Sequence, residues 1–189
     1  MTKNELRSDN LADLYKTVVA PEILKEFNLD NINQVPKLRK IVLNIGIGRA
    51  KDDKKFIETA TNTLRKITAQ QPYYRKAKKS IAAFKLREGN IIGLSVTLRG
   101  ARMYDFLYRI INIVIPRQKD FHGVKIKAFD KDGNYSLGFD DQSIFPELTF
   151  EETSPVHGLQ INIVFSNPSK QLTKAVLSKF GLPFEKENK

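Results

Sequence analysis

Residues 75–99 read RKAKKSIAAFKLREGNIIGLSVTLR, and we expect the fold to be organised around this stretch. Its first part, residues 75–87, carries six basic side chains in thirteen positions and no acidic one, and we name it the basic finger. Its second part, residues 91–99, alternates between apolar and polar side chains, which predicts a half-buried strand. The apolar positions are Leu94, Val96 and Leu98, and the polar positions are Ser95, Thr97 and Arg99.

The basic finger is predicted to form a protruding hairpin. Residues 73–77 are expected to be a strand that leads into it and residues 84–87 a strand that leaves it, with a loop of about six residues between them. A row of cationic side chains on such a hairpin suits the phosphates of a nucleic acid better than a small substrate. The alternative is a basic loop that is simply solvated.

The composition is that of a basic, globular protein. The chain has 189 residues, of which 41% are hydrophobic, and we expect one domain over residues 1–189. Its formal net charge is +11, which favours nucleic acid or an anionic membrane surface as the partner. It contains no cysteine, no apolar segment of membrane-spanning length and no apolar signal sequence in residues 1–10. We therefore expect a soluble, cytoplasmic protein that is not bound to a membrane.

Helical and strand patterns follow one another in a mixed order. Helices are expected after Ser8 or Asp9 with a kink or restart near Ala20, after Asp52 or Asp53, and from Ala101 to Pro116. A last helix is expected to start at Asn167-Pro168 or at Ser169 and to end before Gly181. Strands are expected at residues 37–48, 73–77, 84–87, 91–99 and 159–165. This order predicts the α+β class, as a two-layer sandwich in which helices pack on one face of a mostly antiparallel sheet and a basic hairpin protrudes.

One face of the predicted sheet should be free of helices and polar. Counting every second residue places on it Lys40, Asn44, Ser95, Thr97, Arg99, Gln160 and Asn162. Their amide, hydroxyl and charged groups are well suited to bond ribose, phosphate and base edges of RNA. The alternative is that these side chains meet only water, as one face of an antiparallel sheet commonly does.

The sequence shows no catalytic, cofactor-binding or metal-binding constellation. Gly46 and Gly48 follow a strand as in a dinucleotide fingerprint, but Lys51 stands where the third glycine belongs. The two histidines, His122 and His157, lie in separate irregular stretches. Acidic pairs are expected to cap helices or to lie in solvated loops, and they are Asp52-Asp53, Asp140-Asp141 and Glu151-Glu152. We therefore expect a binding protein with no catalytic residue, cofactor or metal, and not an enzyme.

Aromatic residues flank the basic finger. Tyr73 and Tyr74 stand directly before Arg75, and Phe84 lies at the far base of the finger. Unpaired bases of RNA stack on such rings. The alternative is that the rings belong to the core, where a ring in a strand usually packs.

Several short motifs occur in order between residues 14 and 184. They include KIVLNIGIG at residues 40–48, KAKKS at 76–80, FKLREG at 84–89, VTLRG at 96–100, GNYS at 133–136 and IFPE at 144–147. With these motifs the chain resembles the bacterial large-subunit ribosomal protein number five, the universal 5S rRNA-binding ribosomal protein family. The ordered set is far more specific than any one motif.

The resemblance implies an α+β sandwich that is a structural constituent of the large ribosomal subunit. It implies that the sheet binds 5S rRNA and links it to 23S rRNA in the central protuberance. Asn44, Gln70 and Thr97 are implied to hydrogen-bond 5S rRNA, and Gln70 is implied by the resemblance alone. Asn44 and Thr97 also lie on the predicted polar face, and we assign Lys40 and Arg99 on that face to the same RNA.

The resemblance also implies that the basic finger contacts the P-site tRNA. The finger residues assigned to this contact are Arg75, Lys76, Lys78, Lys79, Ser80, Lys85 and Arg87. Neighbouring large-subunit proteins of the 5S complex and a small-subunit head protein at an intersubunit bridge are further implied partners. His122 and His157 stand where the family usually has arginine, which weakens the case for rRNA contacts there. From the residues alone, a non-ribosomal RNA chaperone and a nucleotide-dependent RNA enzyme remain as alternatives.

Overall fold

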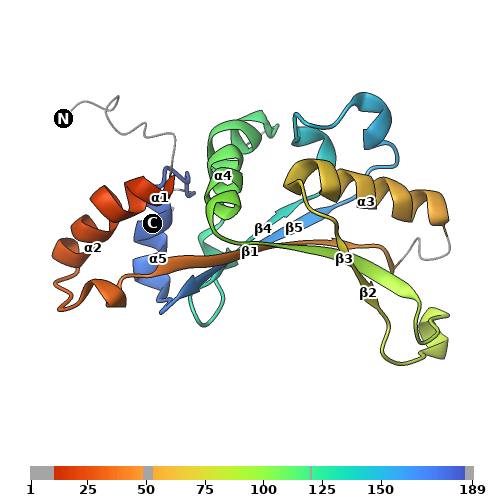
Figure 1. The fold of residues 1–189 in the computed structure, drawn as a ribbon, viewed down its shortest axis with the longest axis horizontal. Helices are drawn as coiled ribbons and strands as arrows, with labels where there is room; N and C mark the ends of the chain where they lie inside the picture. The colour runs from red at the N-terminus through yellow and green to blue at the C-terminus, as the bar shows by residue number, and fades with distance from the viewer. Residues whose placement is uncertain (1–10, 49–52, 120, 186–189) are drawn as a thin grey trace. The chain divides into compact units, whose positions relative to one another are not determined.

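The structure is a computed structural model, and it describes residues 11–48, 53–119 and 121–185. Its strands form one five-stranded antiparallel sheet in the order β2-β3-β1-β5-β4 (Figure 1). The strands are β1 Lys37–Gly46, β2 Tyr73–Lys76, β3 Ile91–Leu98, β4 Tyr135–Phe139 and β5 Leu159–Ser166. The predicted α+β class with an antiparallel sheet is confirmed.

Five α-helices are found in the described part of the chain. They are α1 Leu11–Leu14, α2 Ala20–Glu26, α3 Lys54–Thr68, α4 Ala101–Arg109 and α5 Lys170–Lys179. A π-helical turn over Tyr15–Val19 joins α1 to α2, so the expected kink or restart near Ala20 is a change of helix type and not a break, with Pro21 in the first turn of α2. The predicted cap at Ser8 or Asp9 lies outside the described residues. Among the described residues, no helix has the length and apolar character needed to cross a membrane.

The chain forms two compact units. The described residues of the first unit lie within 11–41, 98–137 and 162–185, and those of the second unit lie within 42–97 and 138–161. Strands β1, β3, β4 and β5 contribute residues to both units. The single domain over residues 1–189 stays a prediction.

In the second unit, α3 covers one face of the strands (Figure 1). The Asp53 carboxylate begins the helix, because it accepts hydrogen bonds from the backbone N–H groups of Lys55 at 2.9 Å and Phe56 at 3.1 Å. This confirms the cap predicted at Asp53, while Asp52 lies outside the described residues. The fully buried side chains of this unit include Ala60 and Leu64 of α3 and Leu43, Ile45 and Leu94 of the sheet.

In the first unit, helices that lie far apart in the sequence pack against one another. α1 contacts α4, and α2 contacts α5. Lys179 Nζ lies 2.7 Å from a carboxylate oxygen of Glu22 and 3.3 Å from one of Glu26. α5 ends as predicted, because Gly181 adopts the left-handed conformation at φ +94° and its N–H donates to the carbonyl of Ser178.

Two strand predictions were wrong. Residues 84–87 form no strand, because Ala82–Phe84 makes a 3₁₀ turn and Leu86 forms only an isolated bridge with Ile81. β2 pairs instead with β3, whose longer alternating run can offer both a ladder of hydrogen bonds and a buried face. Strand β4 was missed, although its alternate residues Tyr135, Leu137 and Phe139 are buried, because it is short and contains a glycine.

Candidate nucleic-acid interface

The register of β2 and β3 decides which side chains share a face. Tyr73 lies opposite Ser95 and Arg75 opposite Gly93, whereas Tyr74 lies opposite Leu94. Residues directly opposite each other point to the same face, and neighbours along a strand point to opposite faces. Tyr73 and Arg75 therefore share one face, and Tyr74 and Leu94 share the other.

Helix α3 covers the face that carries Tyr74. The hydroxyl oxygens of Tyr74 and of Thr61 in α3 lie 3.4 Å apart, and Leu94 is fully buried. The opposite face in the second unit is not covered by α3 (Figure 1). We name this side the open face and define it by Asn44, Tyr73, Arg75, Ser95 and Thr97.

Arg75 is fixed on the open face. Its Nε donates a hydrogen bond of 2.8 Å to the Ser95 hydroxyl, and its guanidinium carbon lies 5.0 Å from the centre of the Tyr73 ring. Tyr73 is itself 66% exposed. Ser95 is only 6% exposed, although it lies on the face that was predicted to be polar. The alternation placed it on the correct face but did not show that Arg75 from the neighbouring strand binds its hydroxyl.

Asn44 lies beside Gly93 on the open face. It is half-buried, whereas its neighbours Leu43 and Ile45 are fully buried on the opposite side of β1. A Cβ at Gly93 would lie 3.9 Å from Asn44 Oδ1 and 3.1 Å from the Ile45 carbonyl oxygen. Glycine at this position therefore leaves no side chain between Asn44 and Arg75.

The other predicted 5S rRNA ligands lie at different places in the fold. Thr97 is exposed on β3 in the second unit, in step with Ser95. Gln70 is half-buried in the bend between α3 and β2, where its backbone N–H donates to the Thr68 hydroxyl at 3.3 Å. Lys40 is half-buried on β1, and Arg99 is exposed just after β3, both in the first unit. The structure thus brings Asn44 and Thr97 to one face of one unit.

Residues 77–90 form the connection from β2 to β3, and we name them the hairpin loop. The backbone N–H of Ala77 donates to the Asn90 carbonyl, and Ile81 and Leu86 exchange two backbone hydrogen bonds. The Ser80 hydroxyl accepts a hydrogen bond of 2.9 Å from the Glu88 backbone N–H. The loop is therefore a hydrogen-bonded structure, and Ser80 contributes to closing it.

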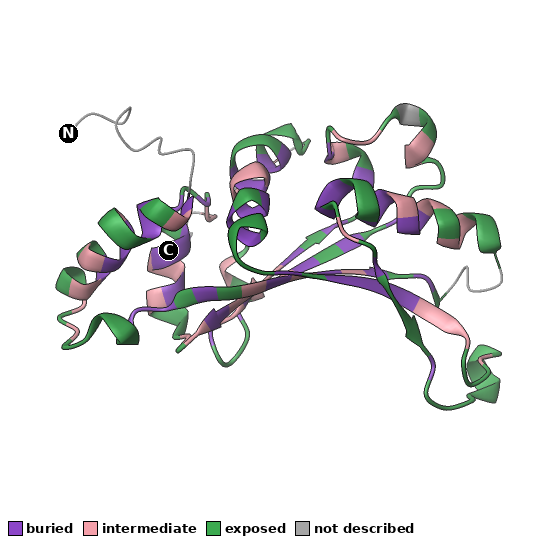
Figure 2. Cartoon of the chain, viewed as in Figure 1, coloured by how far each residue is buried: buried purple, intermediate pink, exposed green. Residues whose placement is uncertain are grey.

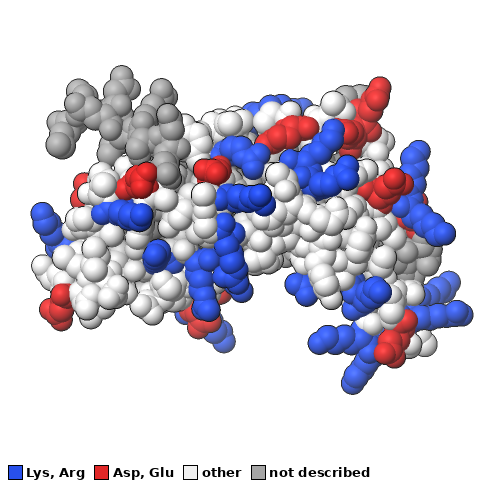
Figure 3. Space-filling view, viewed as in Figure 1, with Lys and Arg blue, Asp and Glu red and all other residues white. Residues whose placement is uncertain are grey.

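The hairpin loop presents cationic side chains to solvent. Lys78, Lys79, Lys85 and Arg87 are all accessible at the surface. Figure 3 shows lysine and arginine side chains gathered on this projection. Two members of the basic finger, Arg75 and Lys76, lie in β2 and not in the loop.

The hairpin loop carries little buried surface. Phe84 at its tip is 73% exposed, and Ile81 is 43% exposed. In Figure 2 the loop and β2 are mostly exposed, whereas the strand segments beneath α3 are mostly buried. The loop is therefore held by backbone hydrogen bonds and has almost no hydrophobic core of its own.

Asp141, Glu152 and His157 take part in contacts that stabilise the fold. Asp141 caps a turn by accepting from the Ser143 N–H at 2.7 Å, and Glu152 forms an ion pair with Lys66 of α3. His157 is buried against the Phe56 ring, and Gln142 accepts a hydrogen bond from its backbone N–H at 2.8 Å. Burial lowers the pKa of His157, against the smaller opposing effects of the Pro155 carbonyl and Asp141.

His157 therefore presents no cation to an RNA in the way that an arginine at a surface would. His122 lies at the surface of the first unit. No group of three or more histidine and acidic side chains suited to a metal ion occurs in the described ranges.

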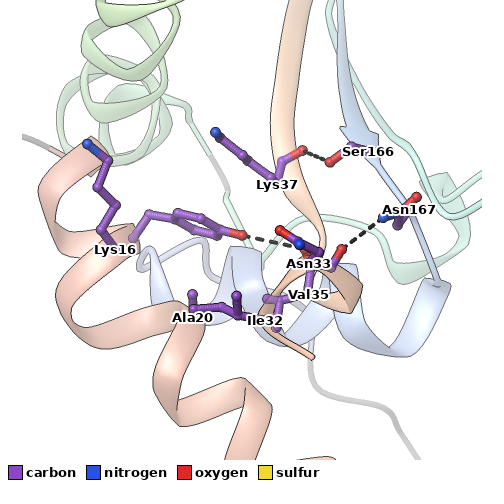
Figure 4. A pocket seen from close by; sticks show the side chains of 9 residues that line it. Lys16, Ala20, Ile32, Asn33, Val35, Lys37, Ser166 and Asn167 are labelled. Carbon is purple, nitrogen blue, oxygen red and sulfur yellow. Dashed lines mark hydrogen bonds between the residues drawn. The ribbon is translucent and has the colours of Figure 1, made fainter. Parts of the chain in front are cut away.

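The first unit contains a cavity of about 370 Å³ between the π-helical turn that leads into α2, the start of β1 and the end of β5 (Figure 4). Its polar groups are bonded to one another, because the Ser166 hydroxyl donates to the Lys37 carbonyl and Asn167 Nδ2 donates to the Asn33 carbonyl. The Tyr15 hydroxyl points to the Val35 carbonyl at 3.5 Å, and burial raises the pKa of Tyr15 to about 12. These groups stabilise the unit and form no constellation for catalysis.

Comparison with known proteins identifies the family. Residues 31–87 match the family described as ribosomal protein L5, and residues 91–184 match the model that describes the C-terminus of the same ribosomal protein family. A protein named large ribosomal subunit protein uL5 from Thermotoga maritima is 48% identical over 176 residues, which cover 93% of this chain and 96% of that protein. The chain belongs to the ribosomal protein L5 family.

Other members of the L5 family show the same extent of similarity. The uL5 protein of Geotalea uraniireducens is 47% identical over 174 residues, covering 92% of this chain and 97% of that protein. The uL5 protein of Lactobacillus johnsonii is 45% identical over 179 residues, covering 95% of this chain and 99% of that protein. The predicted family is confirmed, and as a member of a family of ribosomal proteins the chain is not an enzyme.

Sequence reasoning did not find how Tyr73 and Arg75 are arranged. It placed Arg75 in the tRNA-contacting finger and left Tyr73 open between stacking and the core. Tyr73 and Arg75 alternate along β2, which puts them on the same face. Which residues of β3 lie opposite them follows only from the register of β2 on β3, where Tyr73 lies opposite Ser95 and Arg75 opposite Gly93. That register is a tertiary property, and the sequence predicted residues 84–87 as the partner of β2.

Proposed function

We propose that the chain is a structural constituent of the large ribosomal subunit that binds 5S rRNA with the open face of its sheet. The observation that carries this proposal is the placement of Asn44 and Thr97. Both are accessible polar side chains in the second unit, on the face opposite to the fully buried Leu43, Ile45 and Leu94. A helix packed over that face would have excluded RNA.

The chemistry of the open face fits double-helical or folded RNA. Short amide and hydroxyl groups bond the 2′-hydroxyls and base edges of a shallow RNA minor groove, where long flexible side chains are less needed. Guanidinium and ammonium groups nearby bind phosphates and set the position of the RNA. On this proposal Asn44, Gln70 and Thr97 hydrogen-bond 5S rRNA, with Lys40 and Arg99 contributing charge.

The hairpin loop is proposed to contact the P-site tRNA. Its accessible cations are Lys78, Lys79, Lys85 and Arg87, and Ser80 lies between them. A loop that extends from the end of two strands can reach a partner that the sheet does not touch. Arg75 and Lys76 are assigned to the same contact by family resemblance, and both lie in β2 at the base of the loop, where Arg75 bonds Ser95 on the open face.

Further partners are proposed from the family. They are 23S rRNA in the central protuberance, neighbouring large-subunit proteins of the 5S complex, and a small-subunit head protein at an intersubunit bridge. The proposed location is the ribosome in the cytoplasm.

The direct test is to purify the tagged chain from cells at high salt and to measure the length of the RNA that stays bound. The proposal predicts one RNA with the length of 5S rRNA and a stoichiometric position with the large subunit. A heterogeneous set of RNAs that does not sediment with the subunit would instead indicate an RNA chaperone. Thermal protection by a nucleotide but not by RNA would indicate a nucleotide-dependent enzyme.

A further inference from the structure

Tyr73 and Arg75 form a fixed aromatic and cationic pair at the edge of the open face. The Arg75 guanidinium carbon lies 5.0 Å from the centre of the Tyr73 ring, and Arg75 Nε donates to Ser95 Oγ at 2.8 Å. Two contacts thus hold the side chain of Arg75 in place, whereas the side chain of a solvated arginine is mobile. The ring remains 66% exposed in spite of this contact.

The next residue shows that this exposure is not simply a property of β2. Tyr74 points to the other face, where its hydroxyl oxygen lies 3.4 Å from the Thr61 hydroxyl oxygen of α3, and its exposure is 36%. Tyr73 pairs with Ser95, and α3 does not cover that face. A large ring held at an exposed position beside a cation is a typical base-stacking surface in RNA-binding proteins.

We infer that Tyr73 is a stacking platform for an unpaired base of the RNA that the open face binds. Arg75 holds the ring on one side through the cation–π contact and Ser95, and its remaining N–H groups are directed to the adjacent phosphate. The other side of the ring receives the base. This inference rests on the proposed binding of 5S rRNA and adds to it a contact with a base that is not in a double helix.

The neighbouring residues support RNA as the occupant. Gly93 lies opposite Arg75 and next to Asn44, so the stacking surface continues without an intervening side chain into the hydrogen-bonding surface. A protein partner would more often bury an apolar cluster, whereas the described residues around Tyr73 on this face are a guanidinium, a hydroxyl and an amide. A bulge or loop base next to a helical segment of RNA matches this combination.

The chain contains no tryptophan, which allows a direct optical test. A Tyr73→Trp variant of the full chain would carry its single tryptophan on the open face, and a Tyr74→Trp variant would carry it on the α3 face. We expect a 5S rRNA transcript to quench the Tyr73→Trp fluorescence strongly, because the indole stacks on a base, and to leave Tyr74→Trp nearly unchanged. Equal quenching in both variants, or none in Tyr73→Trp while the RNA is bound, would overturn the inference.

Affinity provides the second measurement. Tyr73→Val removes the ring but keeps a good strand former, and we expect 5S rRNA binding to weaken about tenfold with an unchanged salt dependence. Tyr73→Phe keeps the ring and should bind within about twofold of the original chain. If Tyr73→Val binds as tightly as Tyr73→Phe, the ring stacks on nothing.

The two proposals fail in different ways. If the unmodified chain does not bind the 5S rRNA transcript, the proposed function fails and the stacking contact fails with it. If the unmodified chain binds, and Tyr73→Val binds equally well with Tyr73→Trp unquenched, only the stacking contact is contradicted. A circular dichroism spectrum like that of the unmodified chain is required of each variant, and Tyr73→Phe serves as the folded reference.

Discussion

The open face and the hairpin loop present polar groups to solvent in two different ways. On the open face, Arg75 is bonded to Ser95, and the strands beneath are anchored by fully buried residues such as Leu94. In the hairpin loop, lysine and arginine side chains extend from a backbone that is held by a few hydrogen bonds, and Phe84 at its tip is exposed.

This difference indicates a division of roles. Fixed hydrogen-bonding groups can discriminate among RNA shapes, because a wrong partner leaves them unpaired. Exposed charges attract any phosphate and add affinity that depends on salt. We therefore expect the open face to provide specificity for 5S rRNA and the hairpin loop to provide a mainly electrostatic contact with tRNA.

The largest expected effect concerns stability. Leu94→Ala should lower the free energy of unfolding by about 2–5 kcal/mol, because it leaves a cavity beneath α3. Phe84→Ala in the hairpin loop should change it by about 0.5 kcal/mol or less, because the ring is largely exposed. Urea unfolding of both variants measures the difference, and equal losses would mean that the loop is part of the core.

The next effect concerns the charges of the hairpin loop. In the double variant Lys78→Ala, Lys79→Ala, the salt dependence of tRNA binding should become shallower by about 2 in log–log slope, since two phosphate contacts are lost. The affinity for 5S rRNA should stay at the level of the unmodified chain. Loss of 5S rRNA binding in this variant would show that the loop and the open face act on the same RNA.

A smaller effect is expected from His157 in the packed part of the second unit. Its pKa is lowered by burial, so the unfolded chain takes up a proton at higher pH than the folded chain. Stability should therefore decrease as the pH falls below about 6.5, the ordinary histidine pKa, and the decrease should end below the folded pKa. Thermal unfolding between about pH 8 and about pH 5 measures it.

The matched controls for this pH effect are two substitutions. His157→Phe keeps the contact with the Phe56 ring and removes the titrating group, so the decrease attributed to His157 should disappear. His122→Phe, at the histidine on the surface, should keep it. The opposite pattern would assign the pH dependence to His122.

The smallest effect is local to the hairpin loop. Ser80→Ala removes the acceptor of the Glu88 N–H, and the opening free energy of that amide should decrease by about 0.5–1.5 kcal/mol. Hydrogen exchange at Glu88 should become faster, while urea unfolding of the whole chain stays nearly the same. A large change in global stability would contradict the view that the loop stands apart from the core.

Much of the fold could be predicted from periodicity. The alternation in residues 41–47 and 94–98 placed the buried and accessible residues of β1 and β3 correctly, apart from the covered Ser95, because a single buried face imposes a period of two. Helix signals at Asp53 and Gly181 were also sufficient, because caps are local interactions. The pairing of β2 was predicted wrongly, since β2 pairs with the longer alternating strand β3 and not with residues 84–87.

For the candidate site, the sequence placed Asn44 and Thr97 on one face but could not place Gln70 or Arg75. Gln70 lies in a bend whose direction is set by the left-handed Ala69 and by Thr68, and neither residue gives a clear signal in the sequence. Arg75 belongs to the basic finger by charge and to the open face by its contact with Ser95. The contact between two strands therefore places Arg75 on the open face, whereas its charge alone assigned it to the basic finger.

The central claim is that RNA binds the face of the sheet opposite to α3, and affinity measurements on two variants test it most directly. Asn44→Ala and Thr97→Ala should each weaken binding of a 5S rRNA transcript by about 1–3 kcal/mol, because each leaves a buried polar group of the RNA unpaired. Circular dichroism must show that both variants are folded. Unchanged affinity in both folded variants would contradict the claim.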